Sequence, residues 1–465
     1  MFEGLHADEF FSCNPNILVI RRINLSEPDE ILLLISQLFA WSAPLMAQHT
    51  MHGAGPTPAA TPTAPVAKQN LVTTAATAPD GSLWVVNMNA QGQLRILQSR
   101  DGGLQWLPER VLDTAQDKPA PAGESPVQLA FGPRQQVVIA YPQSLGKRFT
   151  GEVRLIRSSD GGANFSAPVT VHADRQIIGH SFPRVLFDGD GVLHSIWLDG
   201  REKAALTKAG VADADLKQQY RGSAVYRNVS LDGGASFGPD LKLADHSCEC
   251  CRIATTLDDS GKIRLMWRHV FAPNLRDHAF ATLTAETPLI SEPVRATFDN
   301  WAVDACPHHG GALAQAADGS FHALWFGIRG EVAAVRYGRL TAGGQPQGES
   351  RVLPDERAEH ADIAVRGKKV VILYRVFDGE QTLVKAWISD DDGQHFTLRQ
   401  LASSAEENDY PRFVSTLPYQ KNQPNNNQRQ PNLLWTEFQP LKVDHNQFLF
   451  HGHRDRELQV LQEML

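Results

Sequence analysis

Short apolar runs separated by turns recur along most of this chain. Each copy is an apolar run, a turn rich in Asp and Gly, and a second apolar run that ends near a tryptophan or an equivalent residue, as in ALAQAADGSFHALW at 312–325. Short apolar runs bounded by such turns are typical of β-strands, so each copy predicts a β-hairpin. The copies lie at 70–87, 125–141, 182–198, 251–268, 310–326, 361–375 and 411–436.

A second repeat is an eight-residue turn of the form Ser-x-Asp-x-Gly-x-x-aromatic. It occurs as SRDGGLQW (99–106), SSDGGANF (158–165), SLDGGASF (230–237) and SDDDGQHF (389–396). The Asp side chain can accept hydrogen bonds from backbone amides of its own turn, and the Gly can adopt a positive φ where the chain reverses. Each copy therefore predicts a connection between two antiparallel strands, which the aromatic residue anchors to the sheet.

Together the two repeats predict an all-β fold. Hairpins at roughly 50–70-residue spacing favour a β-propeller of about seven four-stranded blades, or six if the first or last hairpin is a closing fragment. Helical periodicity is confined to the N-terminal leader and to residues 202–217. We expect a single propeller domain over residues 70–465.

The N-terminal residues have a different composition. The apolar stretch 31–47 (ILLLISQLFAWSAPLMA) is slightly short for a membrane span and ends in small residues. It predicts a signal peptide over 1–47, with a misassigned leader or a membrane anchor as alternatives. Residues 48–69 are rich in Pro, Ala and Thr and predict a tether. We therefore expect a periplasmic or secreted protein with no membrane span after cleavage.

Charge narrows the classes of partner. The chain has 44 Lys and Arg against 52 Asp and Glu, a net charge of −8. This acidic balance, without a long basic run, argues against binding to nucleic acid or to an anionic membrane surface.

The eight-residue turns resemble the Asp-box, or bacterial neuraminidase repeat, of sialidases and related propellers. The resemblance extends from about residue 70 onward and implies a sialidase-like fold. In that family the box lies on the blade periphery, away from the active site, so it does not define an activity. It makes an exo-acting glycoside hydrolase with a glycan ligand one possible function.

Cysteine and histidine are concentrated at the start of two neighbouring hairpins. In a propeller the first strand of each blade lines the central channel, so residues that lead into these strands gather at one mouth. Cys248 and Cys306 each lie 19 residues before a strand-end tryptophan, and Cys250 and His308 each lie 17 before it. Thiolate and imidazole ligands suit copper or zinc. The candidate metal ligands are Cys248, Cys250, Cys251, Cys306, His308 and His309.

Disulfides are the alternative use of these cysteines. Four cysteines would remain after the predicted cleavage, and an even number in an oxidising compartment is typical of disulfide pairing. Cys248–Cys306 would then join neighbouring blades, and Cys250–Cys251 would form a vicinal disulfide.

Three arginines lead into first strands at similar points: Arg184, Arg252 and Arg412. Three guanidinium groups around a channel would bind a small anionic ligand such as a carboxylate. Sialidases use such a triad, but their Phe/Tyr-Arg-Ile-Pro motif is absent, and the nearest segment has its Pro before Arg184. The alternative is that the arginines pair with neighbouring acids such as Asp188 or Asp409.

No residue can be assigned as catalytic from the sequence. Three functions stay open: a metal-binding or anion-binding propeller, a sialidase-like glycoside hydrolase, and a protein-binding scaffold. A hydrolase of this kind needs a tyrosine, a carboxylate and an acid, for which the available residues are Tyr374, Tyr410, Glu437, Asp199 and Asp304.

Overall fold

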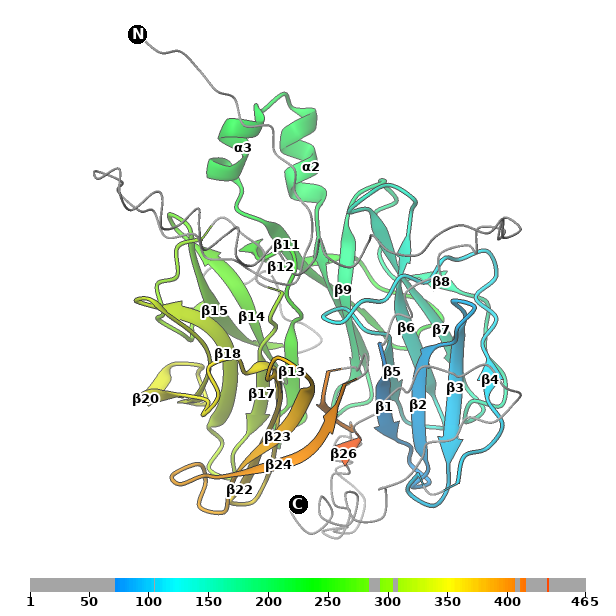
Figure 1. Ribbon diagram of the computed structural model, residues 1–465. Coiled ribbons are helices and arrows are strands. Elements are labelled where there is room, and N and C mark those ends of the chain that lie inside the picture. The colour runs from blue at the N-terminus through cyan, green and yellow to red at the C-terminus, as the bar shows by residue number, and fades with distance from the viewer. Residues whose placement is uncertain are drawn as a thin grey trace, which may run out of the picture. The chain divides into compact units, whose positions relative to one another are not determined.

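The computed structural model describes residues 72–103, 105–283, 293–303, 308–405, 410–414 and 433–434. The predicted leader and tether lie outside these residues. Two helices are described, α2 (Arg201–Lys208) and α3 (Asp213–Gln219), and they occupy the segment predicted to be helical. They connect strand β10 (Leu193–Asp199) to strand β11 (Ser223–Ser230), and Figure 1 shows them beyond the end of β11.

Four sheets share one topology, in which four consecutive strands pair in antiparallel order. The first two are β1 (Thr74–Thr77), β2 (Leu83–Met88), β3 (Leu94–Ser99) and β4 (Arg110–Val111), then β5 (Gln128–Phe131), β6 (Val137–Ser144), β7 (Gly151–Ser158) and β8 (Val169–Thr170). The other two are β17 (Ala312–Gln315), β18 (Phe321–Arg329), β19 (Val332–Leu340) and β20 (Pro346–Val352), then β21 (Glu359–Arg366), β22 (Lys369–Phe377), β23 (Thr382–Ser389) and β24 (Thr397–Ser404).

The remaining strands form one larger and one smaller sheet. An eight-stranded sheet holds two consecutive groups of four strands, which pair with each other through Ser247 and His269. Its strands are β9 (His180–Phe187), β10, β11, β12 (Leu241–Ser247), β13 (Ala254–Leu257), β14 (Ile263–Phe271), β15 (Leu275–Leu283) and β16 (Val294–Arg295). The two-stranded sheet is β25 (Arg412–Phe413) with β26 (Leu433–Leu434).

The predicted count of about seven, or six, blades is therefore wrong for the described residues. Four separate four-stranded sheets are present there. One reason is the Ser247–His269 pairing, which merges two groups of strands into a single sheet. The other is that only two strands of the last group are described.

The predicted hairpins themselves are confirmed, and Asp side chains close several of them. Antiparallel pairs occur at each predicted position, from β1–β2 to β25–β26. Asp188 Oδ1 accepts the backbone N–H of Val192 at 2.9 Å, and Asp258 Oδ1 accepts that of Lys262 at 2.9 Å. Such Asx turns fix the reversal locally, which is why the pattern is readable in the sequence.

The Ser-x-Asp-x-Gly turns have the predicted geometry. In the second copy, Asp160 Oδ1 accepts the hydroxyl of Ser158 at 2.6 Å and the backbone N–H of Asn164 at 2.9 Å. Gly162 has φ +85° and donates its N–H to the Ser158 hydroxyl at 2.8 Å. The other three copies make the corresponding Ser–Asp and Gly–Ser bonds. Each joins the third strand of a group to its fourth.

The core lies between successive sheets. Along β6, Val137 and Ile139 pack with residues of the first sheet, including Trp84, while Val138 and Ala140 pack with residues of β9 and β10. Because side chains of a strand point alternately to its two faces, β6 contributes to two cores, one on each side of its sheet. Sheets that pack face to face in this order form a β-propeller arrangement (Figure 1).

Candidate functional site

A cavity of about 480 Å³ lies where the first strands of the groups converge. Residues of β1, β5, β9, β13, β17, β21 and β25 all line it, as expected for the first strands of a propeller. Figure 1 shows β1, β13 and β17 towards the middle and β4 and β20 at the periphery. Arg412, on the last described group of strands, donates a hydrogen bond at 2.6 Å to the carbonyl of Gly123, which precedes β5.

The structure brings the three predicted arginines to this cavity. Arg184, Arg252 and Arg412 all line it. Arg184 donates to Gln128 Oε1 at 3.0 Å and to Thr255 Oγ1 at 2.9 Å. Arg252 donates to the backbone carbonyls of Gly311 at 3.2 Å and Ala361 at 2.8 Å.

Neutral oxygens therefore hold Arg184 and Arg252 in position. Among the described residues, neither has a carboxylate within ion-pair distance. The predicted pairing with Asp188 does not occur, because Asp188 Oδ2 bonds His194 Nε2 at 2.9 Å. Asp409 lies outside the described residues. No ion pair with a described residue therefore neutralises either guanidinium group directly, and both can interact with a ligand.

The arginines also repel one another. The pKa of Arg184 is lowered to about 10, first by burial and then by the neighbouring charges of Arg252 and Arg412. The charge of Asp362, which also lines the cavity, acts in the opposite sense. An anion in the cavity would relieve this repulsion, since an opposite charge favours the charged form of each group.

Glu124 compensates part of this positive charge from behind the cavity wall. Burial would raise the pKa of Glu124, but Arg252, a hydrogen bond from His360 and Arg412 outweigh burial and lower it. Its Oε1 lies 2.8 Å from His360 Nδ1, and its Oε2 accepts the Gly310 N–H at 2.7 Å. An ionised carboxylate can only accept, so Nδ1 of His360 carries the proton.

A row of stacked rings extends from His360. Its ring stacks on Tyr410 with centroids 3.5 Å apart and on His309 at 4.8 Å. His309 stacks in turn on Phe326 at 4.3 Å, and the Arg375 guanidinium lies 4.5 Å from the Tyr410 centroid. Burial, followed by the charge of His360, lowers the pKa of His309 to about 3, so this ring is neutral.

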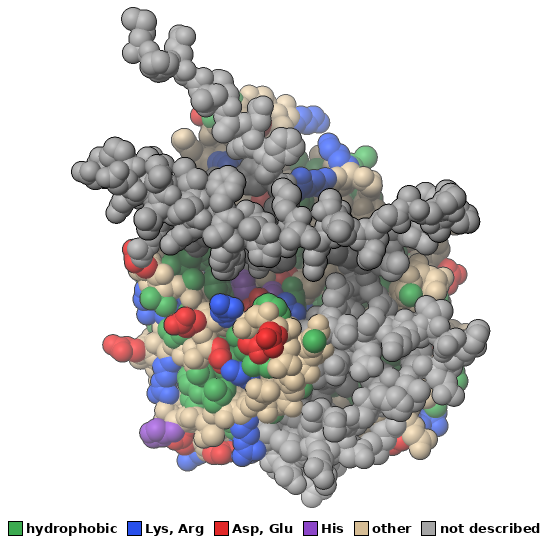
Figure 2. Space-filling model, viewed as in Figure 1, with side chains coloured by type: hydrophobic (Ala, Val, Ile, Leu, Met, Phe, Trp, Pro, Cys, Tyr) green, Lys and Arg blue, Asp and Glu red, His purple; other side chains and the backbone are tan. Residues whose placement is uncertain are grey.

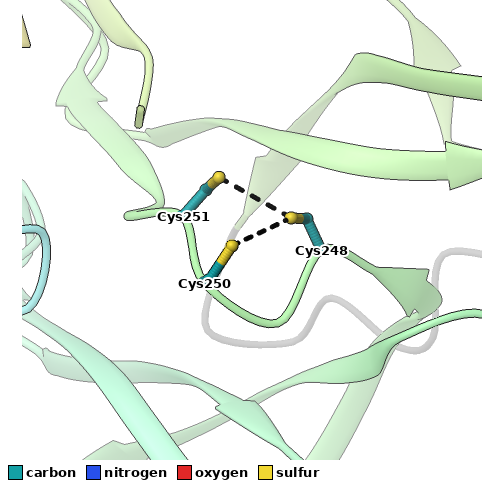
Figure 3. Close-up of side chains that lie close together, drawn as sticks. All are labelled: Cys248, Cys250 and Cys251. Atoms are coloured by element: carbon teal, nitrogen blue, oxygen red, sulfur yellow. Dashed lines mark hydrogen bonds between the residues drawn. The ribbon is translucent and has the colours of Figure 1, made fainter. Parts of the chain in front are cut away.

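Three of the predicted metal ligands form a separate cluster. Cys248, Cys250 and Cys251 lie on the turn between β12 and β13, and their sulfur atoms all lie within 4.8 Å of one another (Figure 3). Cys248 Sγ is 3.6 Å from the sulfur of Cys250 and 3.6 Å from that of Cys251. All three side chains are buried, with exposed fractions of 1%, 6% and 3%.

Cys248, Cys250 and Cys251 form no disulfide with one another, so the predicted Cys250–Cys251 disulfide is wrong for this structure. Hydrogen bonds from Cys250 and Cys251 lower the pKa of Cys248 well below its usual value, and Arg268 and Arg276 act in the same direction. Arg276 Nη1 lies 3.3 Å from Cys248 Sγ. Burial raises the pKa of Cys251.

The predicted histidine ligands do not join this cluster. His309 belongs to the ring stack, and His308 is exposed to solvent with φ +52°. Cys250 and His308 each lie 17 residues before a strand-end tryptophan. The chain turns at His308, so this equal spacing does not place His308 next to the cysteines. Cys306, and with it the Cys248–Cys306 alternative, lies outside the described residues.

The catalytic candidates are dispersed. Tyr374 is buried and donates to Asp355 at 2.6 Å, and Asp199 is buried against Trp197 and Arg201. Neither lines the cavity. Tyr410 lies close behind it, on His360. Glu437 and Asp304 lie outside the described residues.

Sequence reasoning missed Glu124, His360 and Asp362. Glu124 immediately precedes the hairpin at 125–141, His360 immediately precedes the one at 361–375, and Asp362 is its second residue. The arginines were predicted because they lead into the first strand of a hairpin. Glu124, His360 and Asp362 have similar positions, so the same criterion would have found them.

No protein-family model matches the sequence, and no curated protein is significantly similar to it. Solved structures with a similar fold include an α-L-arabinanase of Penicillium chrysogenum complexed with arabinobiose, at 14% identity over 66% of this chain and 89% of that chain, with a TM-score of 0.43. An α-L-arabinofuranosidase of Fusarium graminearum has 12% identity over 70% and 93%, with a TM-score of 0.46. A Trypanosoma rangeli sialidase has 10% identity over 67% of this chain and 53% of that chain, with a TM-score of 0.40. The β-propeller arrangement of this chain follows from its own sheet topology.

The described surface adds two observations. On the face that Figure 2 shows, acidic and basic side chains are interspersed over the described residues instead of forming one patch of a single charge. Among the described helices, none has the length and apolar character that crossing a bilayer requires.

Proposed function

We propose that the central cavity binds the carboxylate group of an acidic sugar at the end of a glycan. The observation that carries this proposal is the meeting of Arg184, Arg252 and Arg412 in one cavity, with Arg184 and Arg252 held only by neutral oxygens. Guanidinium groups match carboxylates with paired N–H donors. The cavity also presents the hydroxyl groups of Thr255 and Thr256 to a sugar.

Direct binding tests this proposal. Thermal shift and titration calorimetry would compare N-acetylneuraminic, glucuronic and galacturonic acids with their methyl esters and with neutral galactose and glucose. We expect at least one acid to bind and its ester to bind much more weakly, because the ester carries no charge. Equal binding of acid and ester, or no binding by any acid, would contradict the proposal.

The Arg184→Met variant identifies the site of binding. A hydrogen bond to a charged group contributes about 1.5–3 kcal/mol, so affinity for the acid should fall roughly 10- to 150-fold. Arg100→Met is the matched control, because Arg100 is exposed on the first eight-residue turn, away from the cavity. The control should bind the acid as the unchanged protein does.

Hydrolysis of the bound glycoside is the second candidate function. The Asp362 carboxylate lines the same cavity, and it accepts backbone N–H groups from Phe413 at 2.9 Å and Ile363 at 3.0 Å. A glycosidase needs a carboxyl group beside the sugar. Fluorogenic glycosides of the sugar acid that binds would reveal turnover, and Asp362→Asn should abolish it with little change in affinity. Binding without turnover would restrict the function to recognition.

A further inference from the structure

We propose that Cys248, Cys250 and Cys251 bind one Cu(I) ion through their three sulfur atoms. This site is separate from the anion cavity and does not depend on the proposed function. Its three ligands come from one four-residue turn, and Figure 3 shows the Cys250 and Cys251 side chains both directed toward the Cys248 sulfur.

The spacing of the sulfur atoms suits a single metal ion. With metal–thiolate bonds of about 2.3 Å, two sulfurs on one ion lie about 3.8–4.0 Å apart. The two sulfur–sulfur distances of 3.6 Å at Cys248 are within a few tenths of an ångström of that range. Binding would therefore need only small side-chain rotations, with release of the thiol protons.

The turn is held in place before any metal binds. The Cys248 N–H donates to the Arg268 carbonyl at 2.9 Å, and the preceding residue, Ser247, pairs with His269. Phe182 packs against the three cysteines from β9. A site whose ligands are already positioned loses less conformational entropy when the ion binds.

The three described ligands are all sulfur atoms and suit Cu(I), with Zn(II) as the competing ion. Thiolates select both ions, but protein zinc sites have four ligands, or three and an accessible water. Among the described residues, no His, Asp or Glu completes the group of three cysteines, and Cys306 lies outside these residues. The sulfurs are buried, with at most 6% of any cysteine exposed, which leaves little access for a water ligand. Cu(I) is a soft ion, and three thiolate sulfurs can complete its coordination.

Positive charge next to the cluster supports an anionic metal–thiolate group. Three thiolates and one Cu(I) carry a net charge of −2, which is costly to bury without compensation. The Arg276 guanidinium lies 3.3 Å from Cys248 Sγ. Arg276 is itself fixed by the Val303 carbonyl, which accepts its Nε–H at 2.7 Å. We therefore expect Arg276 to stabilise the bound state as a positioning residue.

Anaerobic loading of the reduced, full-length chain with Cu(I) tests the site. After removal of excess copper against a Cu(I) chelator, we expect one copper ion per chain, and X-ray absorption should show sulfur as the only ligand atom. Cys248→Ser, Cys250→Ser and Cys251→Ser should each weaken retention by more than about tenfold, since outer-shell changes alone cost 10- to 100-fold. His308→Ala is the matched control and should retain copper, because His308 is exposed.

Thiol alkylation of the unchanged protein keeps the test decisive if a serine variant does not fold. Bound Cu(I) should protect the three cysteines from alkylation, as read by mass spectrometry, and the metal-free protein should lose this protection. The proposal is overturned if no copper is retained, if the serine variants retain it equally, or if Zn(II) occupies the site and Cu(I) does not displace it. A disulfide among the three cysteines in the isolated protein would overturn it as well.

Discussion

The arginine cavity and the cysteine cluster are joined by a single peptide bond, between Cys251 and Arg252, yet they are built in opposite ways. The cavity takes Arg184 from β9, Arg412 from β25 and Arg252 from the segment just before β13, three places far apart in the sequence. The cluster takes its ligands from one turn, Cys248 to Cys251. The cavity is open and holds nitrogen donors, whereas the cluster is closed and holds sulfur.

This difference shows that one short segment can contribute to two kinds of site. Cys251 is buried among thiols, and the next residue, Arg252, points its charge toward the converging first strands. Hydrogen-bond donors in an open cavity suit an anion, while polarisable sulfurs in a dry pocket suit a soft cation. Changes on the Glu124 side should therefore affect the cavity and spare the cluster.

The largest expected effect is that of Glu124→Ala. The change leaves the Gly310 N–H and the His360 ring N–H without their acceptor, and each unsatisfied buried donor costs about 1–3 kcal/mol. We expect the free energy of unfolding to fall by about 2–6 kcal/mol, from the same estimate for two donors. Because the change also removes the carboxylate that compensates Arg252 and Arg412, anion binding should tighten, and Cu(I) retention should be preserved. Denaturant titration and the two binding assays measure this.

Glu249→Ala is the control for that change. Glu249 forms an exposed ion pair with Lys203 at 3.0 Å, and such pairs contribute about 0–1 kcal/mol. Although Glu249 lies within the cysteine turn, we expect neither binding activity to change. An unfolding curve for Glu124→Ala that matches this control would refute the role given to Glu124.

Gly310→Ala should have an intermediate effect that is again confined to the cavity. A Cβ atom on Gly310 would lie 2.0 Å from Arg252 Cγ and 2.6 Å from Glu124 Oε2. Overpacking of this kind typically costs about 1–3 kcal/mol, and the displaced Arg252 should bind the acidic sugar less tightly. At Gly343 the nearest atom to such a Cβ is Thr341 Oγ1, at 3.8 Å. Gly343→Ala should therefore leave stability and anion binding unchanged, and equal losses in both variants would count against the steric argument.

The smallest effect is a change in pH dependence at His309. Its pKa is lowered to about 3 in the folded protein, against about 6.5 when unfolded. Between these values the unfolded state binds a proton that the folded state does not, so stability falls as the pH drops below about 6.5, by up to about 1.4 kcal/mol per pH unit. His309→Phe keeps the ring stacking but removes this titrating group. The free energy of unfolding should therefore depend on pH less steeply, by up to about 1.4 kcal/mol per pH unit. Denaturant titrations at pH 7, 6 and 5 measure the slope, and an unchanged slope would contradict the buried, neutral assignment.

His308→Phe is the neighbouring control. Its ring is exposed, so we expect the pH dependence of stability to be that of the unchanged protein. Copper retention should be insensitive to either histidine change, which again separates the cluster from the ring stack.

Local features of this fold were predictable because local atoms determine them. The turn at Ser158–Asp160–Gly162 is held by bonds within a few residues, so its sequence pattern predicts its geometry. The arginines were predictable for another reason, since equivalent positions in successive repeats converge at the centre. The position of His309 was not predictable from the sequence. His308, the residue before it, has a positive φ, and His309 stacks on His360 instead of joining the cysteines.

The sequence by itself determined the strand hairpins, the Asp-containing turns and the convergence of Arg184, Arg252 and Arg412, because periodicity and short-range hydrogen bonding encode them. Only the tertiary structure decided which buried groups meet. The pairing of Ser247 with His269 merged two groups of strands into one sheet, and Glu124 reached His360 from 236 residues away. Such contacts depend on how whole sheets pack, and no local pattern of residues specifies that packing.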